Sequence, residues 1–392
     1  MHLGHRSNER KMTGWHRAHE CATARGTVVE YANTNADAAS GHESVTRIEM
    51  ARKLASLKGY DFAGQYDPAN RYPGPLYFVP SDTLIGTDTA RALGIRTEDD
   101  LFGGVVPFPF VATKTISHPL IDPDAFAPQN WSHVFGRRIK EAVLFGFTAF
   151  ARGDAHRAGV LVLERGPARI KPPRGVGGRG QTVVSGVAEL DTVLDRIEPL
   201  ALSRDGIVVE QNFDDITTYS VGQVRVSDLL ATYYGTQSLT TDNRGSAVYG
   251  GSDLVAVRGG YDALLSLDPT PEIRLILAQA RTYDTVALQE FPGLIASRRN
   301  YDVASVIDTD GRRRAGVLEQ SWRIGGASAA EIAALESFRA EPTLRAVRAS
   351  CAEVYGLDET PPPRAVVHFR GTDGHVGPIT KYTVVEAYGD SR

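Results

Sequence analysis

Residues 168–185 read ARIKPPRGVGGRGQTVVS, and this stretch points to both the fold and the function of the chain. A short apolar run ends at Lys171, and a loop of glycines and arginines follows before the β-branched residues 182–184. Glycine lets several backbone N–H groups converge on an anion, and nearby cations offset the charge of that anion. The stretch therefore predicts a polyphosphate site, with a glycine-rich surface hairpin as the alternative.

The glycines of this loop also match the dinucleotide fingerprint GxGxxG, through Gly175, Gly177 and Gly180. That fingerprint works when a helix follows the loop and directs its N-terminus at a pyrophosphate. Residues 181–184 (QTVV) are instead typical of a strand. The order strand, loop, strand argues against a Rossmann oxidoreductase that binds NAD, and it favours a loop that folds over a nucleotide.

Composition limits the classes of protein that the chain can belong to. With 392 residues, 42% hydrophobic and 23% charged, it has the make-up of a soluble globular protein of two or three lobes. A net charge of -4 gives no electrostatic reason to expect nucleic acid or an anionic membrane as a partner. The two cysteines, Cys21 and Cys351, suggest neither a disulfide framework nor a cysteine zinc site. Without a signal-like or membrane-spanning apolar run, we expect a cytoplasmic protein.

We expect a disordered leader over residues 1–25, an N-terminal α/β lobe over 26–120 and one larger region over 121–392. The larger region is expected to consist of a first subdomain over 121–205, which contains the glycine loop, a second subdomain over 206–340, and a C-terminal helix and strands over 341–392. The apolar periodicity predicts helices at 44–57, 84–93, 135–150, 154–165, 187–200, 271–287 and 328–355. It predicts strands at 27–31, 75–80, 182–184, 206–210, 219–226, 228–234, 301–307, 315–322, 365–369 and 380–387.

Charged residues recur at the ends and in the middle of these predicted strands. Lys171 precedes the glycine loop, and Glu210 ends a later strand in the sequence VVEQNF. Asp302 and Glu319 occupy the two strands of a hairpin whose turn contains Asp310–Gly311. Strand alternation allows both carboxylates to point to one face, where they would hold Mg²⁺ that bridges nucleotide phosphates. Any one such carboxylate alone is more often a solvated surface residue.

This order and spacing resembles the ATP-grasp superfamily over about residues 120–340, and it is most similar to a bacterial branch. The resemblance implies an α+β protein of ATP-grasp fold, in which two α+β subdomains grip ATP and a small α/β lobe precedes them. It also implies roles for individual residues. By the resemblance, Lys171 contacts the nucleotide phosphates, and the loop with Gly175, Gly177, Gly178 and Gly180 closes over them. The adenine hinge is formed by Glu210, Gln211 and Phe213, and magnesium is bound by Asp302 and Glu319. Arg323 matches an arginine that follows the carboxylates, and Arg138 takes the place of an additional phosphate-contacting lysine, unless it is a solvated helix residue.

The chain departs from the superfamily at two positions. Ser321 stands where members have an asparagine, and a hydroxyl is a weaker Mg²⁺ ligand, so the number of metal ions stays open. The acidic residue that binds the ribose is replaced near Thr218, unless Asp214 or Asp215 serves instead. These departures motivate an alternative function, a non-catalytic ATP-binding protein of the same fold.

The predicted function is an ATP- and Mg²⁺-dependent ligase. A substrate carboxylate would attack the γ-phosphate, and an amine or thiol would capture the resulting acyl phosphate. Arg299 and Arg323 are the candidates to stabilise the transferring phosphoryl group or to hold the substrate carboxylate. The expected partners are small-molecule carboxylate and amine or thiol substrates, without nucleic acid or membrane, and a homodimer is left open.

Overall fold

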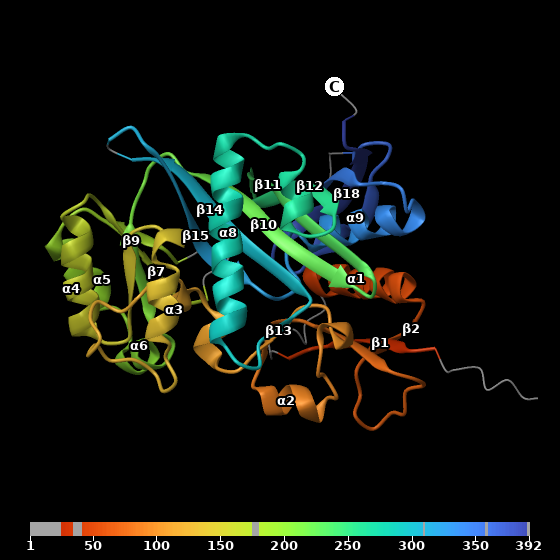
Figure 1. Cartoon of the computed structure of the whole chain (residues 1–392), viewed down its shortest axis with the longest axis horizontal. Helices are drawn as coiled ribbons and strands as arrows, with labels where there is room; N and C mark the ends of the chain where they lie inside the picture. Colours follow the sequence, from red (N-terminus) through yellow and green to blue (C-terminus); the bar gives the residue numbers. More distant parts are fainter. Residues whose placement is uncertain (1–24, 34–40, 175–179, 309, 357–359, 390–392) are drawn as a thin grey trace, which may run out of the picture.

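The computed structural model describes residues 25–33, 41–174, 180–308, 310–356 and 360–389. Within these residues the strands form four sheets, of three, eight, three and four strands. Figure 1 shows three lobes: one around β1, a central one in which α8 crosses the large sheet, and one with α4 and α5 on the outside. The site discussed below lies where the central lobe meets the small four-stranded sheet.

The N-terminal lobe is a parallel α/β unit in which β1 lies between β2 and β3. Parallel neighbours need a crossover, and α1 provides it between β1 and β2. A second small sheet, β13-β5-β4, joins this lobe to the rest of the chain. The elements are β1 (Thr27–Tyr31), α1 (His42–Lys58), β2 (Asp61–Gln65), β3 (Leu76–Pro80), β4 (Leu84–Ile85), α2 (Thr87–Ala92), η2 (Glu98–Asp100), β5 (Gly104–Val106) and β13 (Ile295–Ala296).

A segment of short helical turns leads from this lobe to the four-stranded sheet. It contains η3 (Pro109–Ala112), η4 (Lys114–Ser117), α3 (His133–Arg138) and η5 (Lys140–Ala142). Most residues of η3 and η4 are buried, although the segment has no apolar periodicity. η3 and η4 therefore run largely through the interior of the molecule, whereas α3 and η5 carry exposed residues such as Arg138 and Lys140.

The four-stranded sheet is antiparallel, with the order β6-β9-β7-β8. Its elements are β6 (Gly146–Ala149), α4 (Arg152–Leu163), β7 (Ala168–Lys171), β8 (Thr182–Val184), α5 (Val187–Leu194), α6 (Pro199–Asp205) and β9 (Ile207–Gln211). Helices α4 and α5 cover one face, where Ala168, Ile170 and Val209 pack into a common apolar core with the helices. Because side chains alternate along a strand, Lys171 and Glu210 project from the opposite face.

The eight-stranded sheet has the order β15-β14-β10-β11-β12-β16-β18-β17, and it is antiparallel throughout. Its strands are β10 (Thr217–Val226), β11 (Leu229–Thr241), β12 (Ala247–Arg258), β14 (Arg298–Ile307), β15 (Arg313–Ser321), β16 (Ala346–Tyr355), β17 (Val366–Asp373) and β18 (Gly377–Ala387). The associated helices are α7 (Tyr261–Leu265), α8 (Pro271–Glu290) and α9 (Ser328–Ala340).

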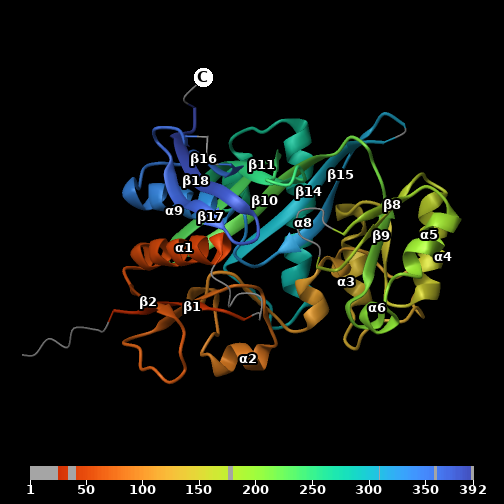
Figure 2. The same cartoon turned by 180° about the vertical axis from the view of Figure 1, so that it is seen from behind.

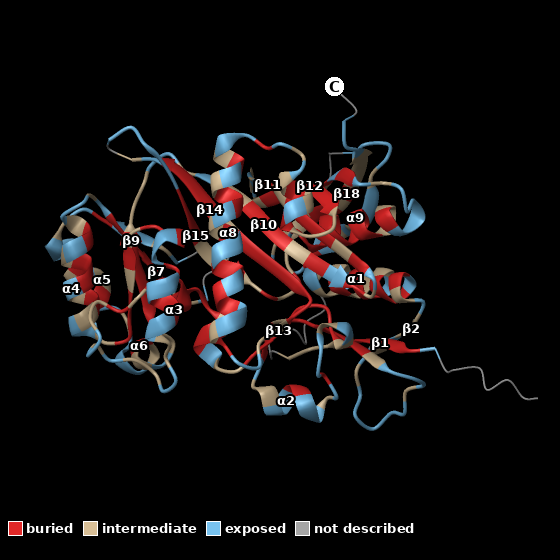
Figure 3. Cartoon of the chain, in the orientation of Figure 1, coloured by how far each residue is buried: buried red, intermediate tan, exposed pale blue. Residues whose placement is uncertain are grey.

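Helices cover parts of both faces of the large sheet. On one face, Val221, Tyr301 and Val303 pack with residues of α8 in one core, and Figure 3 shows these strands buried beneath that helix. On the other face, Tyr233 and Leu254 pack with residues of α9 and α1. Figure 2 shows α1 and α9 side by side on that face. Asp302, one residue from Tyr301 and Val303 in β14, points to the α9 face.

Two predicted helices are wrong in part. Residues 135–150 form α3, a 3-10 turn and the strand β6, because Gly146 lies against the backbone of Glu210, where a Cβ would come within 2.9 Å of its Cα. Residues 328–355 form α9 only to Ala340, and 346–355 are β16, paired between β12 and β18. Both segments pair with strands distant in the sequence, which local periodicity does not report. Helix 84–93 is shortened by β4, and 187–200 is divided between α5 and α6.

The sequence divisions at residues 206 and 341 stay predictions, but two findings bear on them. Strand β9, which follows residue 206, pairs with β6 and β7 of the preceding sheet. Strands β16 to β18 continue the eight-stranded sheet without a break. Among the described residues, no helix combines the length and apolarity needed to cross a membrane.

Candidate functional site

A buried charged cluster lies on the face of the small sheet that α4 and α5 leave uncovered. Lys171 is the last residue of β7, and its ammonium forms an ion pair with Glu210 of the neighbouring strand β9. The imidazole Nε2 of His118 lies 3.1 Å from the other carboxylate oxygen, and all three side chains are buried. Burial alone would raise the pKa of Glu210, but the positive charge of Lys171 and the hydrogen bond with His118 outweigh it and lower this pKa to about 2. Glu210 is therefore ionised at neutral pH.

The glycine loop connects two antiparallel strands, β7 and β8, which confirms the predicted order of strand, loop and strand. A helix does not follow it directly, so the geometry of the dinucleotide fingerprint is absent from the described chain after Gly180. Gly175, Gly177 and Gly178 lie outside the described residues. Gly180 has a φ of 74°, a left-handed conformation that favours glycine.

Asp302 of β14 and Glu319 of β15 are register partners in the large sheet. Asp302 Oδ1 accepts hydrogen bonds from Gln237 Nε2 at 2.7 Å and from Asn300 Nδ2 at 3.1 Å. Glu319 forms an ion pair with the buried ammonium of Lys114. Burial and the negative charge of Glu319 together raise the pKa of Asp302 to about 7. The predicted pair of carboxylates is thus brought together on one face.

This pair offers oxygen ligands of the kind that Mg²⁺ prefers. Within the described ranges there is no cluster of three or more histidine, cysteine or acidic residues that could hold a metal alone. Mg²⁺ is commonly bound by one or two carboxylates together with substrate phosphates and water. Asp302 and Glu319 fit that role, and a cation would relieve the repulsion that raises the pKa of Asp302.

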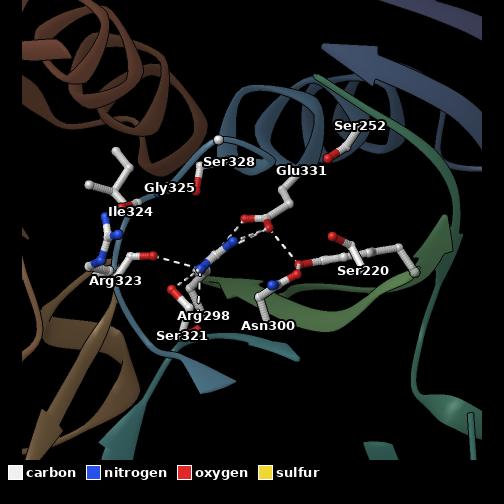
Figure 4. Close-up of polar contacts among 12 residues, drawn as sticks. Ser220, Ser252, Arg298, Asn300, Ser321, Arg323, Ile324, Gly325, Ser328 and Glu331 are labelled. Carbon is white, nitrogen blue, oxygen red and sulfur yellow. Dashed lines mark hydrogen bonds and ion pairs between the residues drawn. The ribbon is translucent and has the colours of Figure 1, made fainter. Parts of the chain in front are cut away.

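A buried polar network supports the carboxylates from the side of α9 (Figure 4). The guanidinium of Arg298 forms a two-pronged ion pair with Glu331 of α9, with Nε–Oε2 and Nη2–Oε1 distances of 2.9 and 2.7 Å. The Tyr233 hydroxyl lies 2.5 Å from Glu331 Oε1 and 2.9 Å from Asn300 Oδ1. Asn300 in turn donates to Asp302. The network therefore connects the first turn of α9 to the candidate metal carboxylate.

Arg298 also fixes the segment that leaves β15. Its Nη1 donates to Ser321 Oγ at 3.1 Å and to the carbonyl oxygen of Arg323 at 2.6 Å. Ser321 is thus close to the carboxylates, but its hydroxyl is already engaged by a cation. Its assignment as a metal ligand stays a prediction.

The two predicted catalytic arginines lie in different surroundings. Arg323 follows β15 at the border of the N-terminal lobe, with 34% of its side chain exposed and Nε 3.7 Å from Asp82 Oδ1. Arg299 is buried and lies on the α8 face, opposite to Asp302, with Nε 3.0 Å from Asp284 Oδ1. Arg299 therefore has no part in the site proposed below, because the thickness of the sheet separates it from the carboxylates.

The predicted adenine hinge lies in and just after β9. Glu210 directs its side chain into the buried cluster, and Gln211 Nε2 donates to the carbonyl of Arg165 at 3.3 Å. Phe213 packs against an apolar cluster formed by Ala304 and Val306 of the large sheet and by Leu144, which lies between η5 and β6. These residues thus lie at the end of β9 and in the connection that leads from the small sheet to the large sheet. Their contact with adenine stays a prediction.

Sequence reasoning missed the residues that complete the two clusters. Lys114 and His118 lie in a segment for which the sequence predicted no element, and a lone lysine and a lone histidine there were the available signal. Arg138, proposed for an additional phosphate contact, bonds instead to Glu290 and Gln289 at the surface. Asn300, Gln237 and Arg298 gave no local signal.

Comparison with known proteins supplies the family and the fold. A family model described as "Protein of unknown function (DUF3182)" matches residues 30–383. The chain belongs to this family. No curated protein matches it. The ADP complex of N5-carboxyaminoimidazole synthetase from Staphylococcus aureus is similar over 92% of this chain and 93% of that chain, with 11% identity and a TM-score of 0.51.

Two further solved structures are similar over most of their length. The biotin carboxylase–β-γ-ATP complex from Campylobacter jejuni has 9% identity, covers 93% of this chain and 88% of that chain, and has a TM-score of 0.49. Phosphoribosylamine–glycine ligase from Thermotoga maritima has 13% identity, covers 92% of each chain and has a TM-score of 0.48. The expected α+β architecture and ATP-grasp fold are confirmed.

Proposed function

We propose that the chain is an ATP- and Mg²⁺-dependent ligase that activates a carboxylate as an acyl phosphate for attack by an amine or thiol. The observation that carries the proposal is that Lys114 and His118 bond to the carboxylates of the two clusters, Glu319 and Glu210. Four residues of extended chain span at most about 14 Å, so the two clusters lie within the reach of one nucleotide. The similarity of fold to an ADP-bound synthetase supports a nucleotide site between these two clusters.

The chain's own residues would mainly position the reactants and neutralise charge. Lys171 would contact the phosphates, and Gln211 and Phe213 would border the adenine. Asp302 and Glu319 would hold Mg²⁺, which supplies positive charge to the phosphates when bound. Arg323 would hold the substrate carboxylate or the transferring phosphoryl group, because it follows the strand of Glu319 by two residues and its guanidinium is partly exposed beside Asp82.

The proposed reaction has two steps. A carboxylate oxygen of the substrate forms a bond to the γ-phosphorus, and ADP leaves. The amine or thiol then attacks the acyl carbon and loses a proton to water, and inorganic phosphate leaves with the electron pair of the broken C–O bond. Neither step requires a covalent bond to the protein.

A thermal-shift screen of nucleotides with and without Mg²⁺, followed by ADP release over a panel of acids and amines, tests the proposal. We expect ATP with Mg²⁺ to raise the melting temperature and one acid to stimulate ADP release. Stabilisation by NAD and not by ATP would reject it.

The engagement of Ser321 by Arg298 favours a second candidate, a protein that binds ATP without catalysis. It predicts stabilisation by ATP without ADP release for any acid and amine in the panel. The same screen therefore separates the two candidates.

A further inference from the structure

The segment 113–118 lies between the two sheets and is bonded to both. On the side of the large sheet, the ammonium of Lys114 forms its ion pair with Glu319. On the side of the small sheet, His118 bonds to Glu210. The His118–Glu210 contact is buried on both sides, whereas in the other pair Lys114 is 5% exposed and Glu319 is 29% exposed, so the carboxylate is accessible from solvent while its ammonium partner is not.

The backbone around Lys114 is fixed on both sides. The supporting contacts are Gln320 Nε2 to the carbonyl of Thr113 at 2.7 Å, Thr148 Oγ1 to the carbonyl of Thr115 at 2.5 Å, and Ser117 Oγ to the Tyr283 hydroxyl at 3.0 Å. With the backbone anchored, the four-carbon side chain of Lys114 is the part of the segment that can change partner. A lysine ammonium is a compact point charge on a flexible stem, which suits it to such a change.

We infer that Lys114 is the resident counter-ion of Glu319 and keeps a divalent cation out of the carboxylate pair until a nucleotide offers its ammonium a phosphate. Lys114 is then a positioning residue that makes metal binding depend on nucleotide binding. This inference rests on the proposed function, since it takes Asp302 and Glu319 as the metal ligands.

Electrostatics gives the reason for this order of binding. While the buried ammonium lies on Glu319, an incoming Mg²⁺ meets a positive charge beside the carboxylate that it would bind. Phosphate oxygens of a nucleotide would accept the ammonium and leave both carboxylates to the metal. With both bound, the ammonium of Lys114 would neutralise a phosphate of the nucleotide, and the metal ion would neutralise Asp302 and Glu319.

Titration with Mn²⁺ alone, followed by electron paramagnetic resonance of the free ion, tests the inference without nucleotide. We expect Lys114→Met and Lys114→Gln to bind Mn²⁺ at least about tenfold more tightly than the unaltered protein. The gain should disappear when Asp302→Asn is added. Lys140→Met, at an exposed lysine of η5, is the matched control and should leave the affinity unchanged.

Glutamine retains a hydrogen-bonding group beside Glu319, so it provides a second variant if methionine prevents folding, which circular dichroism reports. Unchanged Mn²⁺ affinity in a folded Lys114 variant would overturn the inference. In the unaltered protein, ADP should raise the affinity for Mn²⁺, and a lack of this effect would also overturn it. Failure of the proposed function appears separately, as a lack of nucleotide binding by the unaltered protein, since the metal-alone titration uses no nucleotide.

Discussion

Asp302 and Glu319 are register partners on β14 and β15, and their carboxylates have different kinds of partner, hydrogen-bonding amides for one and an ammonium for the other. Glu319 has the ammonium of Lys114, whereas Asp302 accepts hydrogen bonds only from the amides of Gln237 and Asn300 among the contacts described above. Burial and the negative charge of Glu319 raise the pKa of Asp302, and the two amide hydrogen bonds do not offset them. The raised pKa leads to an unusual dependence of stability on pH.

Metal-free protein should lose stability as pH rises through neutrality. The pKa of Asp302 is about 7 in the folded protein against an ordinary value of 3.8, so the folded state binds this proton more tightly than the unfolded state. The stabilisation is complete below about pH 4 and is lost as pH approaches and passes 7. In EDTA, the melting temperature should fall more between about pH 5 and pH 8 for the unaltered protein than for Asp302→Asn. Equal slopes for the two proteins would contradict this account.

The ion pair of Lys171 and Glu210 should show strong coupling in unfolding experiments. Removing one partner leaves a buried charge uncompensated, so Lys171→Met and Glu210→Gln should each cost about 3–5 kcal/mol, and the double variant less than their sum. Urea unfolding of the four proteins gives the coupling free energy. Additive costs would show that the two charges act independently. The low pKa of Glu210 means that its stabilisation persists above about pH 4.5 and is lost as pH falls towards 2.

Glu331→Gln should destabilise the protein through Arg298. Both side chains are buried, at 0% and 2% exposure, and the arginine would lose its only carboxylate partner among the described contacts. We expect a loss of about 3–5 kcal/mol in urea unfolding. The exposed pair of Arg339 and Asp228, also involving α9, is a suitable control, and Asp228→Asn should change the stability little. A similar effect for both variants would argue against the supporting role of the network.

We expect substitution of Arg323 to change activity and substitution of Arg299 to change stability. Arg323→Ala removes a partly exposed guanidinium and should lower kcat/KM for ADP release by about 100-fold, with little change in melting temperature. Arg299→Ala removes a buried partner of Asp284 and should lower the melting temperature. Loss of activity in Arg299→Ala at full stability would restore its predicted catalytic role.

Much of the fold could be predicted from local pattern, and the failures have physical causes. Lys171 and the hairpin of Asp302 and Glu319 were recognisable because strands, glycine loops and tight turns have local signatures. Residues 146–149 and 346–355 were mistaken for helix because their strand partners are far away in the sequence. Lys114 and His118 were missed because their roles depend on tertiary contacts, as His118 and Glu210 lie 92 residues apart. Arg299 was named and Arg298 was not, because only the structure shows which face of the sheet each side chain occupies.

The most direct test of the proposed function is calorimetric titration of ADP with Mg²⁺ into the unaltered protein, Lys171→Ala and Glu319→Gln. The exposed residues Lys140 and Glu164 provide matched controls as Lys140→Ala and Glu164→Gln. We predict binding to the unaltered protein and to both controls, and at least about tenfold weaker binding to the two site variants while they remain folded. Equal binding by folded Lys171→Ala and Glu319→Gln would contradict the proposal that nucleotide and metal lie between these residues.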